Sequence, residues 1–253
     1  MTEAQDAAAL SITPPFGYGA VVPLLKTHLV KANGAQVPPL LAHSNAIPVS
    51  MAEMPRAGRD YPLVFGSADG GNSFAVLAVL GLADGENLFV GADGAWDPGV
   101  YLPAYLRRHP FCMAVVNRDG KQQDERVVCV EQAALDASEG LMIERPDGSV
   151  MSWWGERLRL LQEYEADMLR TRQMCDWVQK LGLLESFSAQ AVADSGEVLN
   201  LAGMYRINED KLAKLNADTL RSLVEKGVMG RLYAQMMSLD RLPALLDRRA
   251  GKK

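Results

Sequence analysis

Residues 61–116 read YPLVFGSADGGNSFAVLAVLGLADGENLFVGADGAWDPGVYLPAYLRRHPFCMAVV, a run of short apolar segments separated by glycine-rich breaks. Segments 61–65 and 74–80 have the length and the apolar composition of β-strands, and the glycine-rich residues 66–73 connect them. This spacing predicts an antiparallel β core, because strands joined by such short links run in opposite directions.

The same run continues with two tight turns. Asp84-Gly85 and Asp93-Gly94 bracket a third apolar segment at 88–90, and Asp-Gly pairs favour turns in which glycine takes a positive φ. We therefore predict a strand at 88–90. Further strands are expected at 111–116, 126–131 and 141–144, with a turn at 145–148.

Aromatic and basic residues gather at 96–111, and this segment has two interpretations. In one, it forms a recognition surface, because Tyr and Arg are frequent anchors at protein interfaces. In the other, a short helix at 100–108 covers the sheet with its aromatic face and leaves Arg107 and Arg108 solvated. The candidate partner-binding residues under the first interpretation are Asp84, Asn87, Tyr101, Tyr105, Arg107 and Arg108.

The hydrophobic period changes to about 3.6 at Ser152, and a proline-free segment then extends to Gly182. We predict one long helix whose apolar stripe packs on the sheet, with a partner-binding face as the alternative, and we expect charged residues such as Asp167 to lie off that stripe. A β segment at 198–207 follows, Asn208 and Asn216 are placed as N-caps of further helices, and a last helical turn is expected to begin at Asp240.

These elements predict an α+β fold, with a mainly antiparallel, strand-rich N-terminal two-thirds packed on one long helix and a C-terminal helical cluster. Residues 1–15 are predicted to be a flexible tail because their apolar residues show neither the helical nor the strand periodicity. Residues 16–253 are predicted to form a single domain that is strand-rich at 16–151 and helical at 152–253.

Composition limits the partners of this 253-residue chain. The net charge of −5 opposes nucleic acid and anionic membranes, and the longest apolar run is too short to cross a bilayer, so we expect neither nucleic-acid binding nor membrane insertion. The first 20 residues carry acids and no base, which is not the pattern of a secretory signal. The cytoplasm is the expected compartment, with export by a signal-independent route left open.

Candidate catalytic groups lack the spacing that catalysis requires. His28 and His43, considered with Glu53 as metal ligands, are separated by proline-broken chain, and metal pairs usually lie one helical turn apart. A Cys112/His109 pair and the Glu163/Asp167 pair remain the enzyme alternatives. Cys112, Cys129 and Cys175 are predicted to be buried, reduced thiols. We predict no catalytic, cofactor or metal residues and no cofactor.

Several segments of the sequence resemble the SapC family of bacterial proteins over residues 19–246. The segments that carry the resemblance are YPLVF at 61–65, LGLADGENLFV at 80–90, WDPGVYLPAYLRRHPF at 96–111, LQEYEADMLRTRQMCDWVQKLGLLE at 161–185 and YRINEDKLAKLNADTLRSLVEKG at 205–227 followed by YAQMMSL. The resemblance brings no catalytic residues with it.

Two roles follow from that resemblance. The family name refers to surface-array (S-layer) proteins, and related genes are often found beside flavin-dependent tryptophan halogenases, iron/2-oxoglutarate oxygenase-like proteins and outer-membrane nutrient receptors. The resemblance therefore implies a non-enzymatic accessory or binding protein, linked to a surface layer or serving a modifying enzyme as its protein partner, with self-association as a further option. The alternative is an enzyme of unrecognised type in the same pathway.

Overall fold

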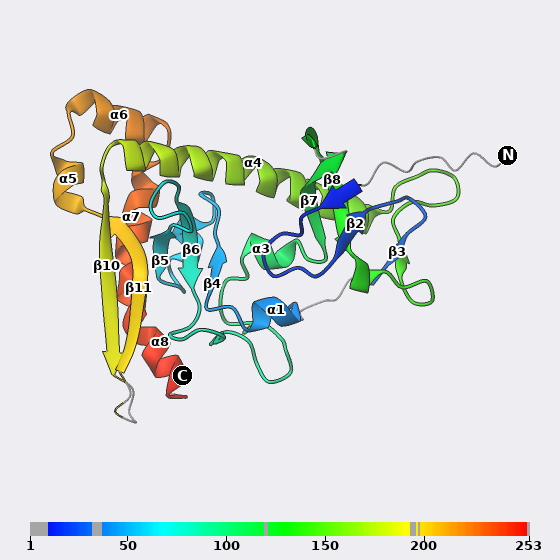
Figure 1. Cartoon of the computed structure of the whole chain (residues 1–253), viewed down its shortest axis with the longest axis horizontal. Coiled ribbons are helices and arrows are strands. Elements are labelled where there is room, and N and C mark those ends of the chain that lie inside the picture. The colour runs from blue at the N-terminus through cyan, green and yellow to red at the C-terminus, as the bar shows by residue number, and fades with distance from the viewer. Residues whose placement is uncertain (1–9, 32–36, 119–120, 193–195, 197, 252–253) are drawn as a thin grey trace. The chain divides into compact units, whose positions relative to one another are not determined.

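The computed structural model describes residues 10–31, 37–118, 121–192, 196 and 198–251 (Figure 1). These residues form antiparallel sheets and helices, and the helices cluster toward the C-terminus, which confirms the α+β prediction. The chain divides into two compact units: unit 1 comprises residues 1–38 and 108–162, and unit 2 comprises residues 39–107 and 163–253. Each unit therefore combines segments from both sides of the predicted boundary at residue 152.

Unit 1 contains a four-stranded antiparallel sheet in the order β1-β7-β8-β2. Its strands are β1 (Leu10–Ile12), β7 (Phe111–Arg118), β8 (Lys121–Glu131) and β2 (Val21–Pro23). A second ladder pairs β3 (Leu29–Val30) with β9 (Leu141–Met142), and a 3-10 turn, η1 (Gln132–Ala134), follows β8. Because β1 pairs with β7, part of the predicted N-terminal tail is a strand, and residues 1–9 lie outside the described residues.

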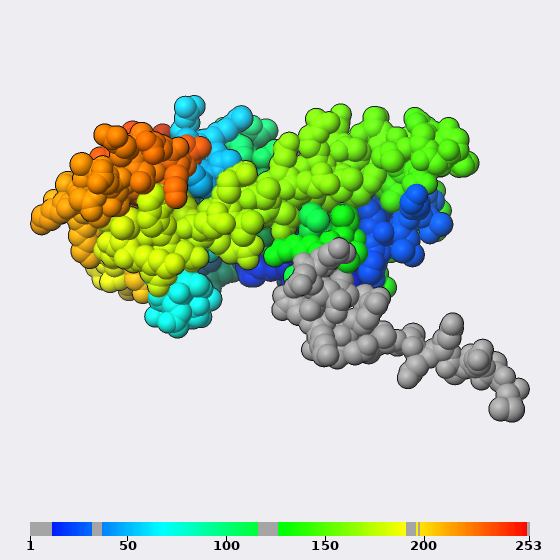
Figure 2. Space-filling model, turned by 90° about the horizontal axis from the view of Figure 1, so that it is seen from above, coloured from blue at the N-terminus to red at the C-terminus, as the bar shows by residue number. Residues whose placement is uncertain are grey.

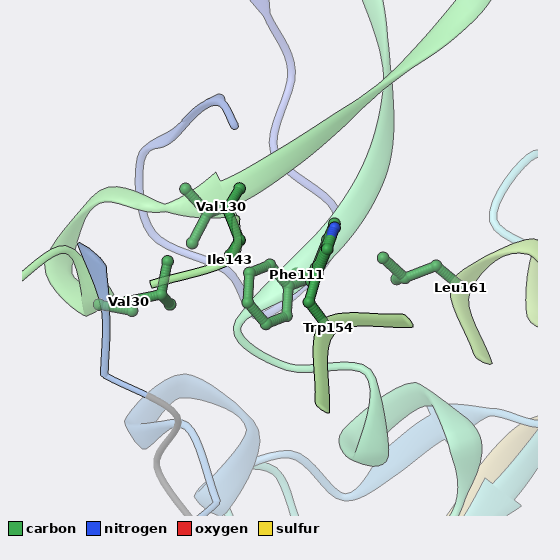
Figure 3. Close-up of a cluster of buried hydrophobic side chains, with 7 residues drawn as sticks. Val30, Phe111, Val130, Ile143, Trp154 and Leu161 are labelled. Carbon is green, nitrogen blue, oxygen red and sulfur yellow. The ribbon is translucent and has the colours of Figure 1, made fainter. Parts of the chain in front are cut away.

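The core of unit 1 is a compact apolar cluster (Figure 3). Phe111 lies at its centre with no exposed surface, and its ring centroid is 4.9 Å from that of Trp154. The remaining members are Val30, Val130, Ala134, Ile143 and Leu161. These residues come from five separate segments of the chain, so the cluster holds the sheet, the β3–β9 ladder and the start of the long helix together.

Unit 2 contains a five-stranded antiparallel sheet in the order β10-β11-β5-β6-β4. Its strands are β4 (Ala46–Pro48), β5 (Leu63–Gly66), β6 (Ala75–Val79), β10 (Leu184–Val192) and β11 (Val198–Ile207). The β10–β11 ladder contains a register shift between Phe187 and Ala189. At the opposite edge, β4 is only three residues long and ends in proline.

The helices of unit 2 lie before, between and after the strands of this sheet along the chain. The short ones are α1 (Pro39–Ala42), α2 (Met54–Ala57) and α3 (Ala104–Arg107). The C-terminal cluster is α5 (Glu209–Ala213), α6 (Ala217–Glu225), α7 (Met229–Ser238), the 3-10 turn η2 (Leu239–Arg241) and α8 (Leu242–Arg249). The predicted caps are confirmed, because the side chain of Asn208 accepts from the backbone of Lys211 and that of Asn216 accepts from Thr219.

Helix α7 supplies hydrogen bonds that the sheet itself does not make. The β11–β5 ladder includes only the pairs Met204/Gly66 and Tyr205/Phe65. Two positions further along this register, where Ile207 would lie opposite Leu63, the buried Gln235 amide accepts from the Ile207 N–H at 3.1 Å and donates to the Leu63 carbonyl at 3.0 Å. A side-chain amide thus replaces one backbone pair of the sheet.

Replacing Gln235 with Met, which is similar in size, is expected to lower the free energy of unfolding by about 2–4 kcal/mol. The change leaves the Leu63 carbonyl and the Ile207 N–H buried without the partners they now have. Urea denaturation followed by circular dichroism measures the loss. Gln162→Met, at an exposed position, is the control, and an equal effect of the two substitutions would show that the Gln235 amide does not stabilise the sheet.

The predicted long helix is α4 (Ser152–Lys180), and it ends as expected at Gly182, which has a φ of +67°. The Gly182 N–H donates to the Gln179 carbonyl and the Leu183 N–H to the Val178 carbonyl, closing the helix end. Its apolar stripe is buried at Trp154, Leu161, Cys175 and Val178. None of the helices in the described part of the chain combines the length and the apolar character needed to cross a bilayer.

Four local predictions differ from the structure. Residues 88–90 make no strand, and only Val90 forms a bridge, to Trp96, because side chains and turns satisfy the neighbouring backbone groups. The helix predicted at 100–108 is limited to α3. Strand β10 was not predicted, since its sequence LESFSAQAV alternates only weakly. The last turn after Asp240 is the eight-residue helix α8.

The three cysteines are buried free thiols, which confirms that prediction. Cys112 and Cys129 lie opposite each other in the β7–β8 ladder. Burial raises the pKa of the Cys129 thiol, and burial followed by the charge of Asp176 raises that of Cys175 to about 12. Both shifts disfavour the thiolate, which is the reactive form.

Because the three thiols are buried, we expect the native protein to react with a disulfide reagent such as dithiobis(nitrobenzoate) about 100-fold or more slowly than the urea-unfolded chain. Absorbance at the released thionitrobenzoate band measures both rates. Complete labelling of the three thiols in the native state at the rate of the unfolded chain would contradict this result.

Candidate functional site

A buried polar cluster of unit 2 is built around the carboxylate of Glu53, which is only 6% exposed. Its Oε2 accepts from the N–H and the hydroxyl of Ser50, at 3.1 and 2.8 Å. Its Oε1 accepts from the Tyr101 hydroxyl at 2.9 Å and from the Ala104 N–H at 2.6 Å. The carboxylate therefore ties the turn before α2 to the segment that leads into α3.

Helix α4 holds the same turn from a second side. The buried Asp167 carboxylate accepts from the Ala52 N–H at 2.7 Å, and the Thr171 hydroxyl accepts from the Met51 N–H at 2.7 Å. Asp167 also pairs with Arg170 at 3.1 Å. The expectation that Asp167 lies off the buried face of the long helix is wrong, because the backbone N–H groups of the turn require an acceptor there.

Two arginines flank the ring of Tyr101. The Arg56 guanidinium carbon lies 5.1 Å and that of Arg107 5.8 Å from the ring centroid, within the range of cation–π attraction. Arg107 also donates to the Tyr101 hydroxyl at 3.1 Å and to the Leu102 carbonyl at 3.1 Å. We call Arg56, Tyr101 and Arg107 the Arg-Tyr-Arg cluster.

In the Arg-Tyr-Arg cluster, hydrogen bonds hold Tyr101 in place, while the two arginine side chains are accessible to solvent. Burial, followed by the nearby Glu53 charge, raises the pKa of Tyr101 to about 12, so its hydroxyl stays protonated and donates to Glu53. The Tyr101 N–H donates to Asp60 at 2.8 Å, and the Tyr61 hydroxyl donates to the Tyr101 carbonyl. Arg56 is exposed, and the Arg107 side chain is 40% exposed.

The six predicted partner-binding residues occupy different environments. Tyr101 and Arg107 are brought together as described. Asp84 and Asn87 share one turn, where Asp84 accepts from Asn45 at 3.2 Å and Asn87 donates to the Leu41 carbonyl at 3.1 Å.

The other two of the six are buried. Tyr105, at 4% exposed, packs its ring against Tyr164 of α4 with the centroids 6.3 Å apart. Arg108 belongs to unit 1, and its guanidinium lies 5.3 Å from the Tyr18 ring centroid. The expectation that Arg108 is solvated is wrong, because it is only 4% exposed.

Sequence reasoning missed Glu53 as the centre of the cluster and Arg56 as a member. Glu53 had been considered only with His28 and His43 as a metal ligand. In the structure its oxygens accept hydrogen bonds, His28 accepts from the Leu25 N–H, and His43 is exposed. Within the residues that the structure describes, no group of three His, Cys, Asp or Glu is placed to hold a metal ion. No spacing signal in the sequence links Glu53 to Tyr101.

The side chains considered as catalytic groups, His109 and the Glu163/Asp167 pair, lie in environments that the fold itself explains. The His109 ring binds the Glu131 carboxylate and lies 5.4 Å from the Tyr18 ring, and Glu131 also accepts from the Gly19 N–H at 2.8 Å. Burial lowers the pKa of His109. On α4, Glu163 is exposed whereas Asp167 is buried, so the two carboxylates do not share an environment.

The fold and the cluster define a mixed α+β protein with an arginine- and tyrosine-rich surface anchored on a buried carboxylate. The chain belongs to the SapC family, whose family model matches residues 29–245. Neither a search of curated proteins nor a search of solved structures finds a match.

Proposed function

We propose that this SapC-family protein is a non-enzymatic accessory protein that binds a protein partner through the Arg-Tyr-Arg cluster. The observation that carries the proposal is the fixation of Tyr101 and Arg107 by the buried Glu53 carboxylate. Tyr and Arg are enriched among the residues that dominate binding energy at interfaces. Side chains held in place before binding lose less conformational entropy when the partner docks.

The hydrogen bonding of the carboxylates supports a binding role over an acid/base role. Each oxygen of Glu53 accepts two hydrogen bonds, and Asp167 accepts a backbone N–H while pairing with Arg170. A general base needs a lone pair within reach of a substrate proton. The carboxylates of Glu53 and Asp167 instead position the turn and the cluster.

The chemistry of the cluster supports a proposal for the kind of partner. Two guanidinium groups beside one aromatic ring suit a segment that presents a carboxylate next to an apolar or aromatic side chain. A modifying enzyme with such a segment on its surface is the proposed partner, and the cytoplasm is the proposed compartment.

Affinity capture of the tagged protein from its native cell, after fractionation into cytoplasm, envelope and medium, tests this function. Mass spectrometry identifies captured proteins from the wild type, from an Arg56→Ala/Arg107→Ala variant and from an Arg172→Ala/Arg221→Ala control, which removes two exposed arginines elsewhere in unit 2. We expect one cytoplasmic enzyme to be recovered with the wild type and the control and to be lost from the cluster variant.

Two results would overturn the proposal. Equal recovery of the enzyme with the cluster variant would show that another surface binds it. Recovery of the chain on the cell surface as an ordered self-assembly would support the surface-layer role in its place. Circular dichroism of each variant establishes that its fold is retained.

A further inference from the structure

We propose that unit 2 carries a second binding site, a groove for a small organic anion with an apolar body. The groove has a volume of about 650 Å³ and lies beside the C-terminal half of α4. It is lined by one face of that helix, by Met51 and by Lys226 and Val228 at the link between α6 and α7. We call it the cationic groove.

The helix presents a regular set of side chains to the cationic groove. Arg170, Met174, Trp177 and Lys180 follow one another at steps of three or four residues, so they lie on one face of α4. Figure 2 shows residues of the C-terminal helices, in orange, beside this half of α4, in yellow-green. The groove is thus formed by elements of a single unit.

The floor of the cationic groove is apolar and rigidly supported. Met174 is 2% exposed and Val228 is 4% exposed. Met51 belongs to the turn whose N–H groups are held by Asp167 and Thr171 of α4. Methionine side chains adapt to apolar ligands of different shapes, and a volume of this size is typical of small-molecule sites, which span about 300–1,000 Å³.

The rim is positively charged although the protein as a whole carries a net charge of −5. Arg170, Lys180 and Lys226 line the groove together with one acid, Asp176. The ammonium of Lys226 lies 4.8 Å from the centroid of the Trp177 ring, which holds this charge above an apolar surface. Local charge of this sign raises the concentration of anions at the groove.

These features together select the ligand class. A carboxylate placed among the three cations allows its attached apolar body to cover Met51, Met174 and Trp177. An inorganic anion would leave the apolar floor in water, and a neutral apolar molecule would gain no attraction from the positive charges of the rim. The site therefore requires both parts in one molecule, and octanoate is a suitable probe.

Isothermal titration calorimetry with octanoate, acetate and 1-octanol tests this requirement. Octanoate is expected to bind at least about tenfold more tightly than acetate, which lacks the apolar body, or 1-octanol, which lacks the charge. Its affinity is expected to fall as salt is added, because the rim is exposed. Equal affinity for octanoate and 1-octanol would overturn the proposal.

Variants locate the bound probe. Lys180→Gln/Lys226→Gln is expected to weaken octanoate binding at least about tenfold, whereas Lys211→Gln/Lys214→Gln, at exposed positions on and after α5, is expected to leave it unchanged. Octanoate is expected to change the tryptophan emission of the wild type but not that of Trp177→Phe. If the Lys180/Lys226 variant binds octanoate as the wild type does, the groove is not the site.

This inference is independent of the proposed function. The groove variants leave Arg56, Tyr101 and Arg107 unchanged, so they are expected to capture the protein partner normally. The two sites would be shown to be separate if the groove variants lose octanoate binding but still capture the partner. The Arg56/Arg107 variant would then lose the partner but still bind octanoate.

Discussion

Glu53→Ala is expected to lower the free energy of unfolding by about 3–5 kcal/mol, because a buried acceptor that serves several donors is removed at once. The Ser50 N–H, the Ala104 N–H and the Tyr101 hydroxyl all donate to this carboxylate in the folded protein. Buried donors without acceptors keep their full desolvation cost. Urea denaturation measures the loss, and hydrogen exchange with mass spectrometry is expected to assign it to unit 2.

A matched carboxylate on the surface provides the control for Glu53. Glu163 is exposed on α4, and Glu163→Ala is expected to change the free energy of unfolding by less than about 0.5 kcal/mol. Glu53→Gln keeps the size of the side chain but turns an N–H₂ group toward existing donors, so most of the loss is expected to remain. Equal stability of Glu53→Ala and Glu163→Ala would show that the carboxylate network does not stabilise the fold.

Phe111→Ala is expected to lower the free energy of unfolding by about 3–5 kcal/mol, through lost burial and the cavity left behind. The ring has no exposed surface and contacts Trp154 in the cluster of Figure 3. Its centroid also lies 6.3 Å from that of Trp153. The substitution is therefore expected to alter tryptophan emission in the folded state as well as stability, and urea denaturation followed by fluorescence records both.

The effect of Phe111→Ala should appear in the hydrogen exchange of unit 1. Val127→Ala, on the same sheet but 37% exposed, is the control and is expected to cost less than about 1 kcal/mol. If Phe111→Ala lowers the free energy of unfolding by no more than this control, the cavity collapses and the apolar cluster is not the main source of stability in unit 1.

The sequence predicted the elements whose signals are local. The long helix, its end at Gly182 and the caps at Asn208 and Asn216 were predicted because periodicity and capping depend on residues a few positions apart. Strands β5, β6 and β7 followed from apolar runs between turns. These features require no knowledge of distant contacts.

Features that depend on distant contacts were missed or wrong. Asp167 and Arg108 are charged and were expected on the surface, yet both are buried because tertiary partners offset the cost of desolvation. No pattern in the sequence predicts that the Gln235 side chain on α7 hydrogen-bonds to two strands of the sheet. Glu53 meets Tyr101 across 48 residues of chain, a separation at which no spacing rule applies.

The two outer strands of the unit 2 sheet bear on how copies of this chain could associate. An edge strand with unpaired backbone groups can act as a template for a strand of another molecule. Strand β10 is interrupted by the irregular step between Phe187 and Ala189, and the three-residue β4 ends at Pro48, which has no N–H to donate. Both edges therefore oppose strand addition, and any ordered array built through this sheet's unit is expected to form through side-chain contacts between folded molecules.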